Sequence, residues 1–142
     1  MGVLSIFGPT ASGKSELALI LAQKLNGEII SCDSMQVYRN MDIGTAKPSP
    51  EEQQLVPHHL IDTYDIHQRY SASRFVELAT DIITDIKKRG KTPILAGGTG
   101  MYARLLLYGG DMLPADRTLH AQLRQRLDSE GQESLLEDLL KL

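Results

Sequence analysis

The chain has 142 residues, is 42% hydrophobic and carries a formal net charge of −3. This composition predicts a folded chain and disfavours a self-sufficient nucleic-acid-binding module, which would normally be basic. The single cysteine, Cys32, excludes an internal disulfide and disfavours a cysteine-based zinc site. No apolar run approaches the roughly 18 residues of a membrane span, and the N-terminus lacks the features of a signal peptide. We therefore expect a cytoplasmic protein without membrane attachment.

Strand and helix signals alternate along the first 108 residues. The helical segments carry apolar residues three and four positions apart, and Ser71 and Gly90 are suited to begin and end the longest of them. The connection over 34–57 contains glycine and prolines with little periodicity, so we expect it to be irregular and either functional or mobile. The alternation predicts an α/β fold with a parallel sheet covered on both faces. The expected strands cover 3–7, 28–32, 59–62 and 93–96, and the expected helices cover 14–25, 71–89 and 101–108.

The pattern changes near Pro114-Ala115-Asp116. Strand signals cease, and two stripes of leucines at helical spacing follow, separated by Gly131. The sequence stops inside the second apolar stripe, at Leu142, so we expect the chain to be the N-terminal portion of a longer protein.

A glycine-rich loop follows the first expected strand and opens the first expected helix. Its eight residues match the pattern G-x-x-x-x-G-K-[ST] in the context that this pattern requires. Backbone N–H groups and the positive end of the helix favour a phosphate, Lys14 supplies a point charge, and the Ser15 hydroxyl suits Mg²⁺. The loop predicts a bound di- or triphosphate and does not specify the reaction. Its residues are Gly8, Pro9, Thr10, Ala11, Ser12, Gly13, Lys14 and Ser15.

Two further candidates follow other expected strands. Asp33 comes after the second strand, where a carboxylate is able to act as a base or hold a metal-bound water, or else serves only as a turn residue. Thr99 lies in a glycine run after the fourth strand and is suited to cap a helix or to donate to a phosphate. Parallel strands place these positions at the same sheet edge as the phosphate loop.

The remaining polar clusters favour structural explanations. His58 and His59 point to opposite faces of an extended chain, which favours structural or substrate-contact roles over a metal site. The basic run Lys87-Lys88-Arg89, with Lys91, lies at the expected end of a helix, where it suits the helix dipole and solvent better than RNA. Cys32 is expected to be a small core residue.

Taken in order, these motifs resemble the tRNA dimethylallyltransferase family, also called tRNA isopentenyltransferases. The first motif is shared with many phosphate-binding proteins, whereas the later ones are far more specific. The resemblance implies a P-loop NTPase-like sheet with flanking helices over 1–112 and the start of an inserted helical domain over 113–142. The matching stretches are GPTASGKS at 8–15, IISCDSMQVYRNMDIGTAKP at 29–48, PHHLID at 57–62, YSASRF at 70–75 and GGTGMY at 97–102.

The resemblance also implies a reaction. The family transfers a dimethylallyl group from dimethylallyl diphosphate to the exocyclic amine of the adenosine on the 3′ side of the tRNA anticodon, and diphosphate leaves. Residues 8–15 would then hold the leaving diphosphate, with Mg²⁺ at Ser15, and Thr99 would stabilise its charge. Asp33 would be the general base. The adenosine, flipped out of its stack, and the tRNA would contact Asp33, Ser34, Met35, Gln36 and Thr99.

Three alternatives remain open at this point. One is an enzyme that prenylates free adenine nucleotides, and another is a small-molecule kinase that binds ATP at the glycine-rich loop. The third is a phosphate-binding fragment without activity. We expect a monomer, with dimethylallyl diphosphate and tRNA as partners.

Overall fold

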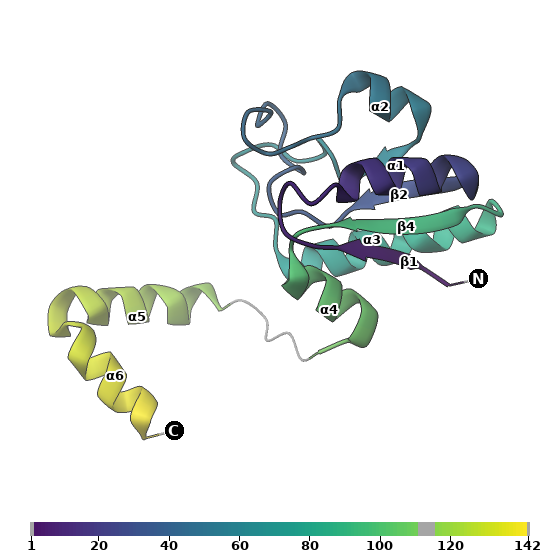
Figure 1. Cartoon of the computed structure of the whole chain (residues 1–142). Helices are drawn as coiled ribbons and strands as arrows, with labels where there is room; N and C mark the ends of the chain where they lie inside the picture. The colour runs from purple at the N-terminus through teal and green to yellow at the C-terminus, as the bar shows by residue number, and fades with distance from the viewer. Residues whose placement is uncertain (1, 111–115, 142) are drawn as a thin grey trace. The chain divides into compact units, whose positions relative to one another are not determined.

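The computed structural model describes residues 2–110 and 116–141 (Figure 1). The chain divides into two compact units, Met1–Gly110 and Asp111–Leu142. The elements of the first unit are β1 (Leu4–Phe7), α1 (Lys14–Lys24), β2 (Gly27–Ser31), α2 (Pro50–Leu55), β3 (His58–His59), α3 (Ala72–Lys88), β4 (Thr92–Gly97) and α4 (Gly100–Tyr108).

The four strands form one parallel sheet in the order β1-β4-β2-β3. Phe7, the last residue of β1, pairs with Gly97, and Ser31, the last residue of β2, pairs with Ala96. The segments that follow β1, β2 and β4 therefore leave the sheet at the same edge, which confirms the placement predicted for the candidate residues. Strand β4 lies between β1 and β2, so its carboxyl end separates the glycine-rich loop, which follows β1, from Asp33, which follows β2.

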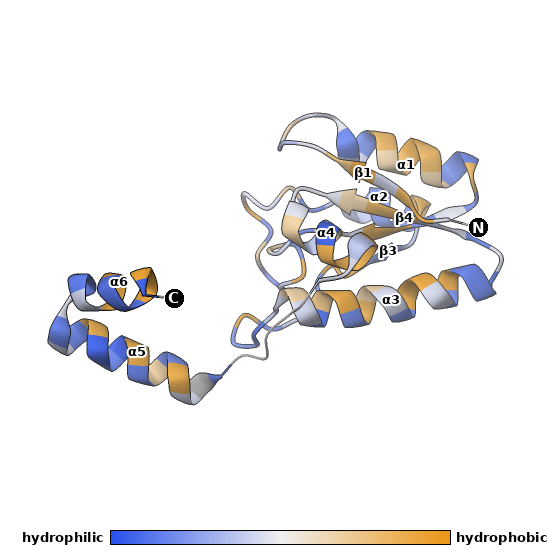
Figure 2. Cartoon of the chain, turned by 90° about the horizontal axis from the view of Figure 1, so that it is seen from below, coloured by the Kyte–Doolittle hydropathy of each residue, from blue (hydrophilic) through white to orange (hydrophobic). Residues whose placement is uncertain are grey.

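Alternate residues of the central strands supply two separate cores. Ile29 and Ile94 are buried with the alanines of α1, whereas Ile30 and Leu95 are buried with α3 and α4. Since successive side chains of a strand point to opposite faces, a sheet covered on both sides requires such apolar pairs. Figure 1 shows α1 and α3 on opposite sides of the strands, and Figure 2 shows hydrophobic residues along β4 and α1. The α/β class is confirmed.

Two predictions for the connection between β2 and α3 are wrong. The expected strand over 59–62 is the two-residue β3 instead, because Leu60 and Asp62 adopt left-handed backbone conformations with φ of 61° and 51°. The stretch 34–57 is not wholly irregular, since it contains α2. Ser49 and Glu52 form a capping box at the start of this helix, a local signal that the sequence carries.

The basic run predicted to face solvent is partly engaged in the structure. Arg89 and Lys91 hydrogen-bond to Glu28, whose side chain is 2% exposed on β2, and His59 Nε2 lies 2.7 Å from the same carboxylate. Hydrogen bonds from Arg89 lower the pKa of Glu28 far below its usual value, although burial opposes this shift. Arg89 and Lys91 therefore do not simply face solvent, as the sequence predicted. The local pattern does not indicate this pairing, because Glu28 lies more than 60 positions away in the sequence.

The second unit contains α5 (Arg117–Glu130) and α6 (Gln132–Leu140), as the two leucine stripes predicted. The Asp116 side chain accepts hydrogen bonds from the first turn of α5, and Arg126 pairs with both Glu130 and Asp138, which ties the two helices together. The predicted boundary between residues 112 and 113, and the break at Pro114-Ala115, lie outside the described residues. Within 2–110 and 116–141, none of the helices combines the length and apolar character that crossing a membrane requires.

Candidate active site

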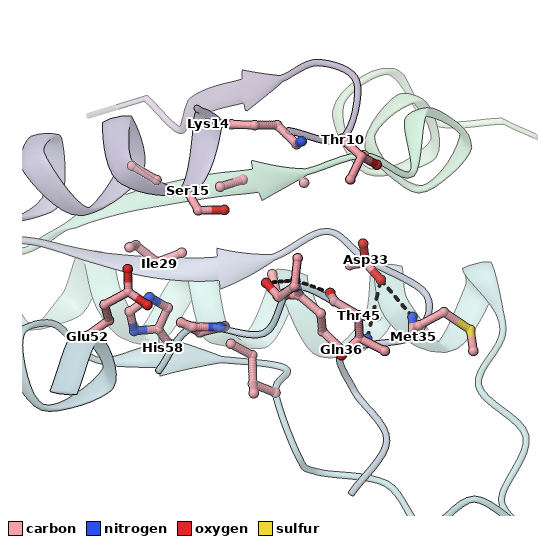
Figure 3. A pocket seen from close by; sticks show the side chains of 18 of the residues that line it. Thr10, Lys14, Ser15, Ile29, Asp33, Met35, Gln36, Thr45, Glu52 and His58 are labelled. Carbon is pink, nitrogen blue, oxygen red and sulfur yellow. Dashed lines mark hydrogen bonds between the residues drawn. The ribbon is translucent and has the colours of Figure 1, made fainter. Parts of the chain in front are cut away.

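One cavity of about 520 Å³ opens at the carboxyl edge of the sheet. Thr10, Lys14 and Ser15 line it from the side of the glycine-rich loop and α1 (Figure 3). Asp33 and Gln36, from the segment after β2, line the opposite side. A cavity beyond the carboxyl ends of the strands is the usual place for a ligand in an open α/β sheet.

The glycine-rich loop has the backbone conformation of an anion site. Ala11 and Gly13 are left-handed, with φ of 63° and 79°, and Gly13 begins α1 without a side-chain cap. The first N–H groups of α1 therefore have no side-chain acceptor at the N-cap and are available to an anion at the positive end of the helix. Lys14 Nζ donates to Pro9 O at 2.7 Å, so the ammonium folds back over its own loop.

Asp33 serves as a turn residue, one of the roles that its position allowed. Its Oδ1 accepts hydrogen bonds from the backbone N–H of Met35, at 2.8 Å, and of Gln36, at 3.3 Å. This turn holds the carboxylate in place at the end of β2. Among the described residues no donor is bonded to Oδ2, which leaves that oxygen for a ligand in the cavity it lines.

Gln36 also lines the cavity, but its amide is occupied. Its Nε2 donates to the carbonyls of Thr45 and Ala46, and its Oε1 accepts from Ser31 Oγ at 2.8 Å. This side chain fixes the loop 41–46, several residues of which form a wall of the cavity. This part of the connection therefore lines the cavity, and Gln36 holds it in place.

Lys47 is a residue that sequence analysis missed. Its side chain is 6% exposed and its Nζ donates to Tyr38 O, Asp42 Oδ1 and Asp62 Oδ1 at 2.6–2.8 Å. Burial alone would lower the pKa of Lys47, but the two carboxylates outweigh burial and raise it. A buried lysine is not visible in a sequence until its acidic partners are known to converge.

His58 and His59 diverge as predicted for neighbours on a strand. His58 lines the cavity beside Glu52, and its Nδ1 lies 2.7 Å from Val56 O (Figure 3). Burial lowers the pKa of His58. His59 instead faces Glu28. Within residues 2–110 and 116–141 no cluster of three or more His, Cys, Asp or Glu side chains is suited to a metal ion.

Not every predicted site residue lines the cavity. Thr99 occupies the N-cap of α4, as expected, but its side chain makes no capping hydrogen bond and it lies just beyond the lining residues Gly97 and Gly98. The predicted residues that line the cavity are Thr10, Ala11, Ser12, Gly13, Lys14, Ser15, Asp33, Met35 and Gln36, and those that do not are Gly8, Pro9, Ser34 and Thr99.

Comparison with known proteins identifies the family. A family model described as IPP transferase matches residues 36–142. The chain belongs to the IPP transferase family. Its fold is that of solved members: it superposes on the tRNA isopentenylpyrophosphate transferase of Bacillus halodurans with a TM-score of 0.74 and 45% identity, over 98% of this chain and 46% of that one.

Two curated relatives are more similar in sequence than that structure is. The chain is 57% identical over 123 residues to a tRNA dimethylallyltransferase of Lactiplantibacillus plantarum, covering 87% of this chain and 40% of that protein. It is 52% identical over 141 residues to tRNA dimethylallyltransferase 1 of Trichlorobacter lovleyi, covering 99% and 46%. This IPP transferase family chain therefore spans less than half the length of either relative.

Proposed function

We propose that the chain carries the catalytic core of a tRNA dimethylallyltransferase. The reaction joins C1 of dimethylallyl diphosphate to the exocyclic nitrogen of an adenosine in tRNA. The bond between C1 and the bridging oxygen breaks, and its electron pair leaves with diphosphate. One proton of the amine is transferred to a base.

The observation that carries this proposal is the pairing of an anion loop and a carboxylate across one cavity. The loop over 8–15 suits the diphosphate, and Asp33 lies opposite it, at the end of β2 (Figure 3). A transfer between a phosphate ester and an amine needs these two functions on either side of the reacting carbon. The names of the curated relatives support the same reaction.

Stabilisation of the leaving group is assigned to the loop. The N–H groups at the start of α1, the Lys14 ammonium and the Ser15 hydroxyl would hold the charge that develops on diphosphate. To reach the diphosphate, Lys14 would give up its hydrogen bond to Pro9 O. This bond is exposed to solvent, so exchanging it costs little free energy. Thr99, at the N-cap of α4, would add a hydroxyl after movement of its side chain.

The site fits Mg²⁺ bound largely through the diphosphate. Ser15 offers one hydroxyl oxygen at the cavity and no three-residue acidic or histidine cluster surrounds it in the described chain. Mg²⁺ commonly takes few protein ligands and completes its shell with phosphate oxygens and water. When bound, the ion neutralises charge on the leaving diphosphate.

Asp33 is proposed as the general base. The exocyclic amine of adenine is barely acidic, so the carboxylate accepts a hydrogen bond from it and takes the proton as the new C–N bond forms. The turn occupies Oδ1, so Oδ2 is the oxygen that would accept this proton. Ser34 and Met35 follow in the same turn and are proposed, with Gln36, to border the adenosine of the tRNA. The reaction is proposed to take place in the cytoplasm.

The test is a transfer assay with the protein that carries this chain. The protein is incubated with Mg²⁺, labelled dimethylallyl diphosphate and either unmodified tRNA or AMP. A separate incubation with labelled ATP and small-molecule acceptors tests the kinase alternative. Label in tRNA supports the proposal, whereas label only in AMP, or only phosphoryl transfer from ATP, refutes it.

A second arm tests the base. Asp33→Asn should abolish transfer and leave diphosphate binding within about twofold of the unaltered protein. Asp65→Asn is the matched control, because Asp65 Oδ1 caps a similar turn by accepting from His67 N–H, outside the cavity. Loss of diphosphate binding in Asp33→Asn would contradict the assignment and make Asp33 a structural or metal-site residue.

A further inference from the structure

Gly97, the last residue of β4, occupies the place where the two halves of the site meet. It pairs with Phe7, which leads into the glycine-rich loop, and lies beside Cys32, which precedes Asp33. The sheet order β1-β4-β2 makes the end of β4 the spacer between the loop and the carboxylate. The width of this spacer sets how far apart the two lie.

The approach of Gly97 to Cys32 is closer than any side chain permits. A Cβ built on Gly97 would lie 2.2 Å from the Cys32 carbonyl oxygen, 2.5 Å from its carbonyl carbon and 2.9 Å from its Cα. All three are backbone atoms, which cannot rotate aside. The φ of Gly97 is not left-handed, so glycine is required here for the close approach alone.

Hydrogen bonds with residues on either side of Gly97 hold both peptide groups of Cys32. Cys32 N–H donates to Ala96 O at 2.8 Å, and Cys32 O accepts from Thr99 N–H at 3.2 Å. Cys32 Sγ also lies 3.6 Å from Thr99 O. Burial raises the pKa of the Cys32 thiol to about 12, so this sulfur contributes packing and no thiolate chemistry.

From this geometry we infer that Gly97 is a positioning residue of the transfer reaction, acting through the Cys32–Asp33 peptide on the Asp33 carboxylate. The inference rests on the proposed function for its catalytic consequence. The Cys32–Asp33 peptide is the only covalent link from β2 to the base, so the orientation of this peptide sets the direction of the carboxylate. Gly97 allows that peptide to lie against β4.

The size of the effect follows from the interatomic distances. Ordinary van der Waals contact begins near 3.4 Å, so a methyl group at position 97 moves the Cys32 carbonyl away from its 2.2 Å position by about 1 Å. A displacement of about 1 Å at a reacting group reduces the rate by up to about 100-fold. Gly97→Ala should therefore lower kcat by about this factor.

The matched control lies three residues further along. A Cβ on Gly100, in the first turn of α4, has no atom within 4 Å, and Gly100 does not line the cavity. Gly100→Ala should retain kcat and the KM for dimethylallyl diphosphate. Gly97→Ala should lose kcat while the KM and the affinity for diphosphate stay within about threefold, because the loop over 8–15 is unchanged.

A second readout separates this inference from the proposed function. Amide hydrogen exchange, measured by NMR on the chain itself, should accelerate in Gly97→Ala at Thr99 N–H and Met35 N–H, which bond to Cys32 O and Asp33 Oδ1. It should not change at Leu17 N–H in α1, which bonds to Gly13 O. If the unaltered protein fails to prenylate tRNA, the proposed function fails, and this exchange pattern still decides whether Gly97 positions Asp33.

The inference is overturned if Gly97→Ala is as active as Gly100→Ala, or if it loses diphosphate affinity together with kcat. Should Gly97→Ala not fold, Asp33→Glu moves the carboxylate by about one methylene without disturbing β4. A loss of kcat near 100-fold in that variant supports a strict requirement for carboxylate position, and full activity refutes it.

Discussion

Replacement of Glu28 by glutamine tests the account of the ion cluster at the amino-terminal part of the sheet. Glu28 is 2% exposed and its two oxygens accept from Arg89, Lys91 and His59. Glutamine has nearly the same shape but offers one acceptor oxygen and one NH₂ donor. If the oxygen keeps Arg89 Nη1 and Lys91, the new NH₂ group faces Arg89 Nη2 and His59.

The magnitude follows from the hydrogen bonds that the substitution removes. Two of the four charge-assisted hydrogen bonds to Glu28 disappear, each contributing about 1.5–3 kcal/mol. Arg89, Lys91 and His59 have side chains that are 39%, 31% and 27% exposed, so they regain water and reduce the penalty. We therefore expect Glu28→Gln to lower the free energy of unfolding by about 3 kcal/mol, at the low end of the values for broken buried pairs.

The pH dependence gives an independent check. Because the folded-state pKa of Glu28 lies far below its usual value of 4.5, the carboxylate contributes its full stability above pH 4.5 and loses it as the pH falls further. The glutamine variant lacks this titrating group. The difference in unfolding free energy between the two proteins should therefore narrow progressively below pH 4.5.

Urea unfolding of the chain at neutral pH and at several values below pH 4.5 measures both effects. The matched control is Asp85→Asn, which removes the other carboxylate bonded to Arg89; that group is 63% exposed, so its loss should cost no more than about 0.5 kcal/mol. A Glu28→Gln change below about 1 kcal/mol, or one that does not vary with pH, would refute the reasoning.

Three further substitutions, the last with a matched control, test other parts of the structure. Lys14→Ala should weaken diphosphate binding by about 10–100-fold, measured by calorimetry, without lowering stability, since its one hydrogen bond is exposed; unchanged affinity would contradict the loop assignment. Lys47→Met should lower the free energy of unfolding by about 2 kcal/mol in urea titrations, and a change under about 0.5 kcal/mol would show that the loop holds without it. Phe75→Ala should lower the free energy of unfolding by about 3–5 kcal/mol in the same assay, because Phe75 is fully buried and its ring stacks on Tyr102 with the ring centroids 4.9 Å apart. Its control, Leu140→Ala, changes an 87% exposed position and should alter that free energy by no more than about 0.5 kcal/mol.

Elements governed by local spacing were predictable. The loop over 8–15 and the start of α1 follow from glycines and a lysine within eight positions, and α3 follows from its apolar period and from Ser71, which caps it by accepting from Arg74 N–H. The capping box at the start of α2 is equally local, but it lies among prolines that are typical of an irregular connection. The shortness of β3 was not readable, because an apolar run does not reveal the left-handed residues within it.

The candidate site divides along the same line. The sequence by itself determined which chemical groups are present and that the loop, Asp33 and the glycine run leave one edge of a parallel sheet. Only the tertiary structure decided how these groups are used. Gln36 and Lys47 hold the segment between β2 and α2 in place, and Arg89 and Lys91 neutralise Glu28. The tertiary structure also revealed that Gly97 has no side chain to clash with the Cys32–Asp33 peptide that precedes the carboxylate. The physical reason is distance along the chain, since local patterns encode backbone conformation, whereas charge pairing and close packing depend on residues that meet only after the sheet has formed.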